Sequence, residues 1–235
     1  RKEDSVLQYL QPIPKSNKMV GSAAINIYQV SDEIIHMMNL AYKNIDDAFK
    51  QLIQFTSDRS DEIVKREDTV NILNTEISDY ISAALANPNV NANSSQALAS
   101  FYLSLVHLER MSDYAKNINY QARKGIQNRL SREDQAIILE MADLTSEGQE
   151  KIYDYKAMKA ISRKAHARTH EWRQMQINEI KENQLDSEAG IMMSRIFNDF
   201  LRINDHAEDV AEEFDQIELD LNEDSIDQKA ELQQA

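Results

Sequence analysis

The sequence has 235 residues, 42% of them hydrophobic, which is enough for one large domain or two small ones. Its formal net charge of −14 and the lack of any basic stripe exclude nucleic acid as a partner, because a polyanion would be repelled. The absence of cysteine excludes disulfides and thiolate metal sites, and no apolar run approaches the length of about 18 residues that direct membrane insertion requires.

The N-terminal segment differs in character from the rest of the chain. Pro12 and Pro14 restrict the backbone ahead of the first periodic segment, so residues 1–16 read as a linker. Because the sequence begins with Arg1 rather than methionine, we expect this linker to follow another part of a longer protein.

Beyond the linker, the sequence predicts an all-α protein. The whole sequence has only 4 glycines and 3 prolines, two of which lie in the linker, and six segments carry apolar residues at helical spacing. The expected helices cover roughly residues 17–55, 61–86, 95–123, 132–158, 162–183 and 191–214. They form one three-helix bundle over 17–125 and a second over 126–215, and the acidic stretch 216–235 reads as a frayed helix or a disordered tail.

The third and sixth expected helices resemble each other at an offset of 92 residues. Asp113 corresponds to Asp205 in this register, whereas Glu109 corresponds to Leu201. The matching apolar positions are Leu105, Leu108 and Ala115 in the third helix and Phe197, Phe200 and Ala207 in the sixth. The repeat therefore predicts two related bundles packed against each other.

Two carboxylates of the third helix form a candidate metal site. Glu109 falls within the apolar stripe and Asp113 lies at its edge, so both face the same neighbours. Their charges repel and lose hydration unless an arginine, a proton or a metal ion offsets them. Glu67, Asp68 and Asn71 of the second helix are the expected partners, because oxygen ligands on facing helices suit Mg²⁺, Mn²⁺ or iron.

A structural ion network is the alternative to this metal site, because an arginine would neutralise the carboxylates equally well. Its candidate members are Arg66, Arg110 and Arg123.

The sequence contains no signature of a catalytic centre. There is no glycine-rich phosphate loop, and no serine stands in a nucleophile-elbow setting. His166 and His170 have the i, i+4 spacing of zinc ligands, but no glutamate follows His166, so we interpret both as polar surface residues. We therefore expect no enzyme.

Several of these residues also match a known family. Residues 108–113, Leu-Glu-Arg-Met-Ser-Asp, resemble the Leu-Glu-Arg-x-x-Asp motif of the PhoU phosphate-uptake regulators. Glu67, Val70, Asn71 and Leu73 are similar to the pattern on the preceding helix of that family. The second half, through His170, Arg173, the loop to Gly190 and residues 200–211, resembles the PhoU-like region at the C-terminus of bacterial sodium/phosphate cotransporter family proteins. The resemblance covers residues 17–215.

This resemblance implies a cytoplasmic regulatory domain of a sodium-dependent phosphate transporter, held at the cytoplasmic face of the inner membrane. The transporter's transmembrane region would be part of the same polypeptide and would precede the linker; a homo-oligomer is the other assembly left open. A free-standing PhoU-type regulator adaptor is the second hypothesis. A di-metal carboxylate enzyme is the third, disfavoured because the Glu-x-x-His pairs of such enzymes are missing.

The resemblance also implies divalent or iron metal ions at the glutamate/aspartate motifs. Glu109 and Asp113 carry over in the first half. In the second half only Asp205 carries over, because Leu201 replaces the glutamate, and Glu208 one turn further on is the candidate substitute.

Overall fold

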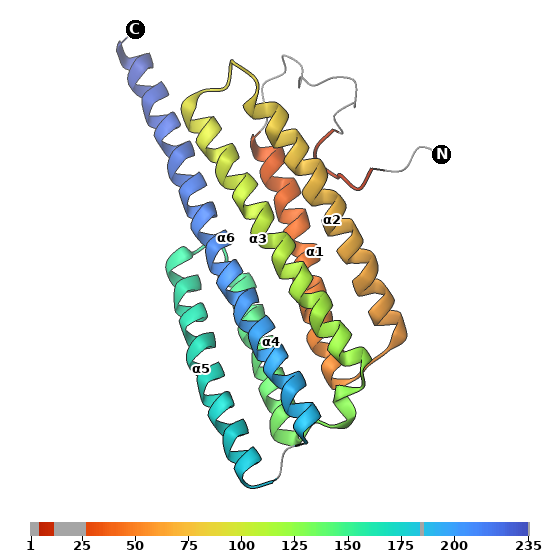
Figure 1. Cartoon of the computed structure of the whole chain (residues 1–235). Helices are drawn as coiled ribbons and strands as arrows, with labels where there is room; N and C mark the ends of the chain where they lie inside the picture. Colours follow the sequence, from red (N-terminus) through yellow and green to blue (C-terminus); the bar gives the residue numbers. More distant parts are fainter. Residues whose placement is uncertain (1–4, 12–26, 184–185, 235) are drawn as a thin grey trace.

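The structure, a computed structural model, describes residues 5–11, 27–183 and 186–234, with side chains as far as residue 223. These ranges contain helices and no strand, which confirms the all-α prediction (Figure 1). The helices are α1 (Ile27–Ile53), α2 (Ser57–Leu85), α3 (Ala92–Arg123), the 3₁₀ turn η1 (Ile126–Asn128), α4 (Arg132–Lys151), α5 (Tyr155–Lys181) and α6 (Ser187–Gln234). None of the described helices is both long enough and apolar enough to cross a lipid bilayer.

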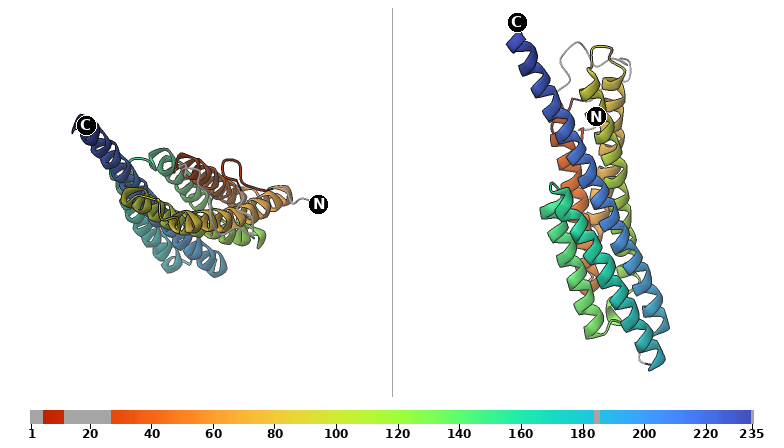
Figure 2. Two further views of the ribbon diagram at one scale, coloured as in Figure 1. Left: turned by 90° about the horizontal axis from the view of Figure 1, so that it is seen from above. Right: turned by 90° about the vertical axis from the view of Figure 1, so that its left-hand side faces the viewer.

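The helices form two three-helix bundles packed together, as predicted. α1, α2 and α3 contact one another in the first bundle, and α4, α5 and α6 do so in the second. The bundles meet where α3 lies along α6 and where α1 lies against α4 (Figures 1 and 2). The first helices of the two halves are therefore in contact, and so are the third helices.

The core is continuous across this contact between bundles. The ring of Phe49 on α1 packs edge-on against Phe200 of α6, with the centroids 6.4 Å apart. Trp172 of α5 packs on the other side, 5.7 Å from Phe200 and 6.0 Å from Phe197. All four rings are buried, so these aromatic residues join helices of both bundles into one apolar interior.

Side-chain caps explain where several helices begin. The N-caps Thr56, Asn91, Ser131 and Asp154 each accept a hydrogen bond from a backbone N–H three residues further on. At Ser131 the hydroxyl accepts from the Asp134 N–H while the Asp134 carboxylate accepts from the Ser131 N–H, which forms a capping box. Gly125, at φ 82°, provides the left-handed residue that follows α3.

The boundary between the fourth and fifth helices differs from the sequence expectation. Apolar periodicity predicted one helix through Met158, but α4 ends at Lys151 and α5 begins at Tyr155. The Asp154 carboxylate caps the new helix. Ile152 and Met158 are buried on either side of the break, so the apolar pattern continues across it although the helix does not.

The sixth helix is much longer than the predicted 191–214. It has 48 residues and continues through the acidic range 216–235 as far as Gln234. Ile217 is buried and Leu221 is half-buried against the core, so the apolar stripe extends one further turn at a spacing of four. In Figure 1 this part of α6 runs past α4 and α5 beside α3.

Part of the predicted linker packs on α1. The backbone N–H groups of Gln8, Tyr9 and Leu10 donate to Oε1 of Glu33, at 2.8, 3.1 and 3.4 Å. His36 Nδ1 lies 3.0 Å from the other oxygen of Glu33, and Leu10 is buried in the core. Residues 12–16 of the predicted linker lie outside the described residues.

Candidate functional site on the third helix of each bundle

Three of the four predicted carboxylates of α2 and α3, Glu67, Glu109 and Asp113, lie near one another in the first bundle. Glu67 of α2 is buried, whereas Glu109 and Asp113 of α3 are half-buried. Burial raises the pKa of Glu109, and so do the charge of Asp113, a hydrogen bond between the two carboxyl groups and the charge of Glu67, while Arg110 opposes these effects. We call Glu67, Glu109 and Asp113 the carboxylate cluster. The negative charges of Asp113 and Glu67 therefore oppose the ionisation of Glu109.

Glu67 is oriented by two neighbours. Its Oε1 accepts a hydrogen bond of 2.8 Å from the Asn71 amide, and its Oε2 lies 3.4 Å from Lys116 Nζ of α3. Asn71 therefore lies beside Glu67. Asp68, the remaining predicted ligand on α2, is solvent-exposed one position along from Glu67.

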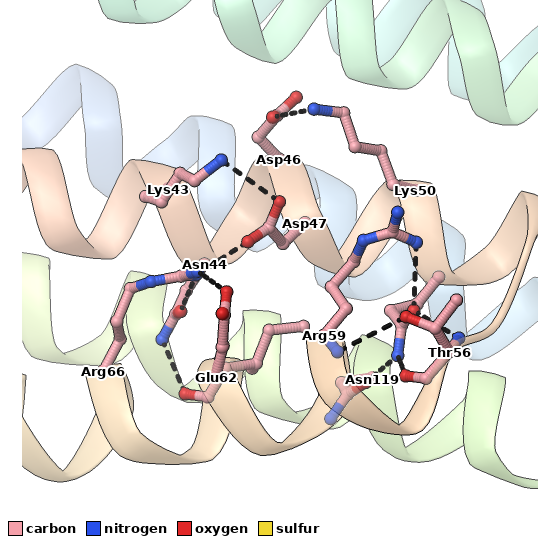
Figure 3. Close-up of polar contacts among 12 residues, drawn as sticks. Lys43, Asn44, Asp46, Asp47, Lys50, Thr56, Arg59, Glu62, Arg66 and Asn119 are labelled. Carbon is pink, nitrogen blue, oxygen red and sulfur yellow. Dashed lines mark hydrogen bonds and ion pairs between the residues drawn. The ribbon is translucent and has the colours of Figure 1, made fainter.

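The arginine alternative is not realised through Arg66. Its guanidinium turns to α1, where Nη1 lies 2.8 Å from Asp47 and donates to Asn44 at 2.9 Å (Figure 3). Within the described ranges no ion pair joins Glu109 to an arginine. The cluster is paired with Lys116 through Glu67, and Arg110 acts on Glu109 only through its charge.

Sequence reasoning missed the polar network between α1 and α2. The Gln51 amide oxygen accepts from the Thr56 N–H at 3.0 Å and from the Arg59 guanidinium at 3.2 Å, and its nitrogen donates to Asn119 of α3 at 3.3 Å. The available signal was Asn44, Asp47 and Gln51 standing on the buried side of α1. These contacts join three helices of the first bundle, and both Arg59 and Arg66 are engaged away from the carboxylate cluster.

The second bundle carries a different pair at the corresponding place. Asp205 of α6 lies opposite His166 of α5, with Oδ1 and Nε2 2.6 Å apart. Leu201, at the position of Glu109, packs against the core, and Glu208 is half-buried one turn beyond Asp205. A histidine and one carboxylate thus stand where the first bundle has three carboxylates, so no like-charge repulsion needs an ion.

The sequence also gave no indication of a polar group between the bundles. His107 of α3 meets His206 and Asp209 of α6 where these two helices pack together. The two histidines are 99 residues apart and belong to different halves, so no local spacing relates them.

Residues 34–122, from α1 to the end of α3, match the family model of the PhoU domain. This match confirms the PhoU resemblance inferred from the sequence.

Solved structures extend the likeness to the second bundle. The chain is similar to PhoU from Pseudomonas aeruginosa, with a TM-score of 0.69 and 18% identity over 81% of this chain and 96% of that one. It is also similar to the phosphate transport system regulatory protein PhoU from Streptococcus pneumoniae, with a TM-score of 0.67 and 16% identity over 82% of this chain and 94% of that one. No curated protein sequence matches the chain. The fold is therefore that of PhoU across both bundles.

Proposed function

We propose that this protein regulates phosphate transport as a PhoU-type adaptor and has no catalytic activity of its own. The observation that carries the proposal is the PhoU fold over 96% and 94% of the lengths of two solved PhoU chains, together with the PhoU domain at residues 34–122. One of these relatives is described as a phosphate transport system regulatory protein. Its partner is then a membrane transporter, with the adaptor acting at the cytoplasmic face of the membrane.

A second candidate is the same regulatory domain joined to a sodium-dependent phosphate transporter in one polypeptide. It is supported by the resemblance of the second half to the C-terminal region of sodium/phosphate cotransporter family proteins. The adaptor is favoured because both solved relatives are PhoU proteins that this chain covers almost end to end. The full-length reading frame separates the two candidates, since transmembrane segments ahead of Arg1 would establish the second.

The carboxylate cluster is the proposed cation site of this regulator. Asp113 of α3 and Glu67 of α2 both act on Glu109 through their charges, and Asn71 donates to Glu67. An all-oxygen set of this kind suits Mg²⁺, Mn²⁺ or iron. A cation bound among these carboxylates would remove the repulsion between them. Asp205 and Glu208 form a weaker proposed site, because His166 already occupies one side of Asp205.

Phosphate uptake tests the regulatory role. The chain is expressed in a bacterial strain that lacks its own PhoU protein, and radiolabelled phosphate uptake is measured in starved and in phosphate-replete cells. Wild type should restore the difference between the two conditions. Leu108→Pro, which interrupts the middle of α3, is the unfolded control and should restore nothing. Uptake that stays unregulated with well-expressed, folded wild-type protein would rule out the adaptor role in that system.

A further inference from the structure

Three metal-ligating side chains converge between the bundles, on the side of α3 that faces α6. His107 Nδ1 lies 2.9 Å from His206 Nδ1 and 3.6 Å from Asp209 Oδ2. One ligand atom of each residue lies within 4.8 Å of the other two, and all three residues are half-buried. Figure 1 shows α3 and α6 side by side along this contact.

The two histidines approach each other closely enough for their Nδ1 atoms to share one proton. Two Nδ1 atoms at 2.9 Å share one proton, because one nitrogen has to accept what the other donates. Burial lowers the pKa of His206, and the charge of His107 lowers it further, whereas Asp209 and Asp205 act in the opposite direction. The Nδ1 atom that accepts carries no proton, and an unprotonated imidazole nitrogen is what binds a metal ion.

We propose that His107, His206 and Asp209 bind a divalent transition-metal ion of the Zn²⁺ class. Two imidazoles and one carboxylate are a ligand set used by zinc and by iron(II), whereas Mg²⁺ and Ca²⁺ prefer oxygen ligands throughout. Tetrahedral ligands at zinc bond lengths lie about 3.3 Å apart. The two distances from His107 Nδ1, 2.9 and 3.6 Å, lie on either side of that value, so binding requires only small side-chain movements.

The surroundings support an ion at this place. The Tyr114 ring stacks on His206 with centroids 5.8 Å apart and holds the imidazole in its orientation. Asp209 is 47% exposed, which gives the ion a path from solvent and leaves a fourth position for water. Asp205 acts on His206 with further negative charge, which Arg110 opposes, and Glu213 lies close enough to interact with His107.

This site differs from the carboxylate cluster in chemistry and in position. α3 carries both, with Glu109 and Asp113 beside α2 and His107 beside α6. The ligands of the new site come from both bundles, so the ion would tie one bundle to the other. Zn²⁺ is expected to prefer the site of His107, His206 and Asp209, because nitrogen ligands are present only there. Mg²⁺ is expected to prefer the carboxylate cluster.

Metal titration of the full chain, stripped with chelator, tests the proposal. We expect one Zn²⁺ to bind through this site and the affinity to fall at least tenfold in His107→Gln, in His206→Gln and in Asp209→Asn. His170→Gln, which changes an exposed histidine on α5, is the matched control and should bind Zn²⁺ like wild type. Unchanged Zn²⁺ affinity in folded His107→Gln, or no Zn²⁺ binding by wild type, would overturn the assignment.

A measurement on wild type alone keeps the test decisive if a variant does not fold. The chain has 5 histidines, few enough for the imidazole nitrogens to be followed individually by ¹⁵N NMR during the Zn²⁺ titration. The Nδ1 signals of His107 and His206 should shift together with one equivalent of metal. Shifts confined to His36, His166 and His170 would place the ion elsewhere and reject the site.

Discussion

Replacing Glu109 by glutamine should change the thermal stability in opposite directions with and without a cation. In chelator, the variant removes one charge from the carboxylate cluster, where burial, Asp113 and Glu67 raise the pKa of Glu109. Because Glu109 is half-exposed and solvent screens the repulsion, the gain is about 0.5 kcal/mol. For a chain of this size, that gain raises the melting temperature by about 1–2 °C.

With a cation the order should reverse. A ligand at 100 times its dissociation constant stabilises the folded state by about 2.7 kcal/mol, so Mn²⁺ at that level should raise the wild-type midpoint by about 5–10 °C. Glu109→Gln loses a charged ligand and should gain much less. Differential scanning fluorimetry in EDTA, Mg²⁺ and Mn²⁺ measures both effects, with Glu150→Gln, an exposed glutamate on α4, as the matched control.

Two results would refute this reasoning. If cations leave the wild-type midpoint unchanged, the cluster holds a proton rather than a metal and its carboxylates are structural. If cations raise wild type and Glu109→Gln equally, the stabilising ion binds at another place.

Three further changes test the structure. Arg66→Met leaves the buried Asp47 with only Lys43, at 3.3 Å, and should cost about 3 kcal/mol in urea unfolding, much of it recovered in the double variant with Asp47→Asn. Phe200→Ala opens a cavity between Phe49 and Trp172 and should cost about 3–5 kcal/mol, whereas no comparable loss in the same assay would show that the bundles do not share a core. Burial raises the pKa of Asp199 from 3.8 to about 7, so the folded state keeps a proton that the unfolded state releases, and stability should fall as pH rises from about 4 to 7 and then level off. Asp199→Asn should abolish this slope, and a slope retained in the variant would assign it to another group.

Helical spacing explains which parts of the structure were predictable. Glu109 and Asp113 are four residues apart, and so are Glu67 and Asn71, so each pair occupies one helix face whatever the tertiary contacts are. The connection between α2 and α3 is short, so the two helices are neighbours. It could therefore be predicted that these two faces meet. The carboxylate cluster is therefore visible in the sequence.

Features that depend on tertiary packing were not predictable in this way. The break between α4 and α5 contains no glycine or proline, and an aspartate cap marks it only once the helix has ended. His107 meets His206 because α3 and α6 pack in one particular register, which no local pattern specifies. Several carboxylates on its own helix and on neighbouring helices were candidate partners for Arg66. Arg66 pairs with Asp47 because of the way α2 packs on α1, which the sequence does not specify.

α6 is long enough to pack in both halves of the molecule. At 1.5 Å per residue, its 48 residues form a rod of about 72 Å, whose first part completes the second bundle and whose later part lies beside α3 of the first (Figures 1 and 2). Because α6 is one continuous helix, a tilt of one end of α6 also moves the other end, with no loop between them. For the same reason the halves should melt in a single calorimetric transition, because neither can lose its share of α6 while the other remains intact.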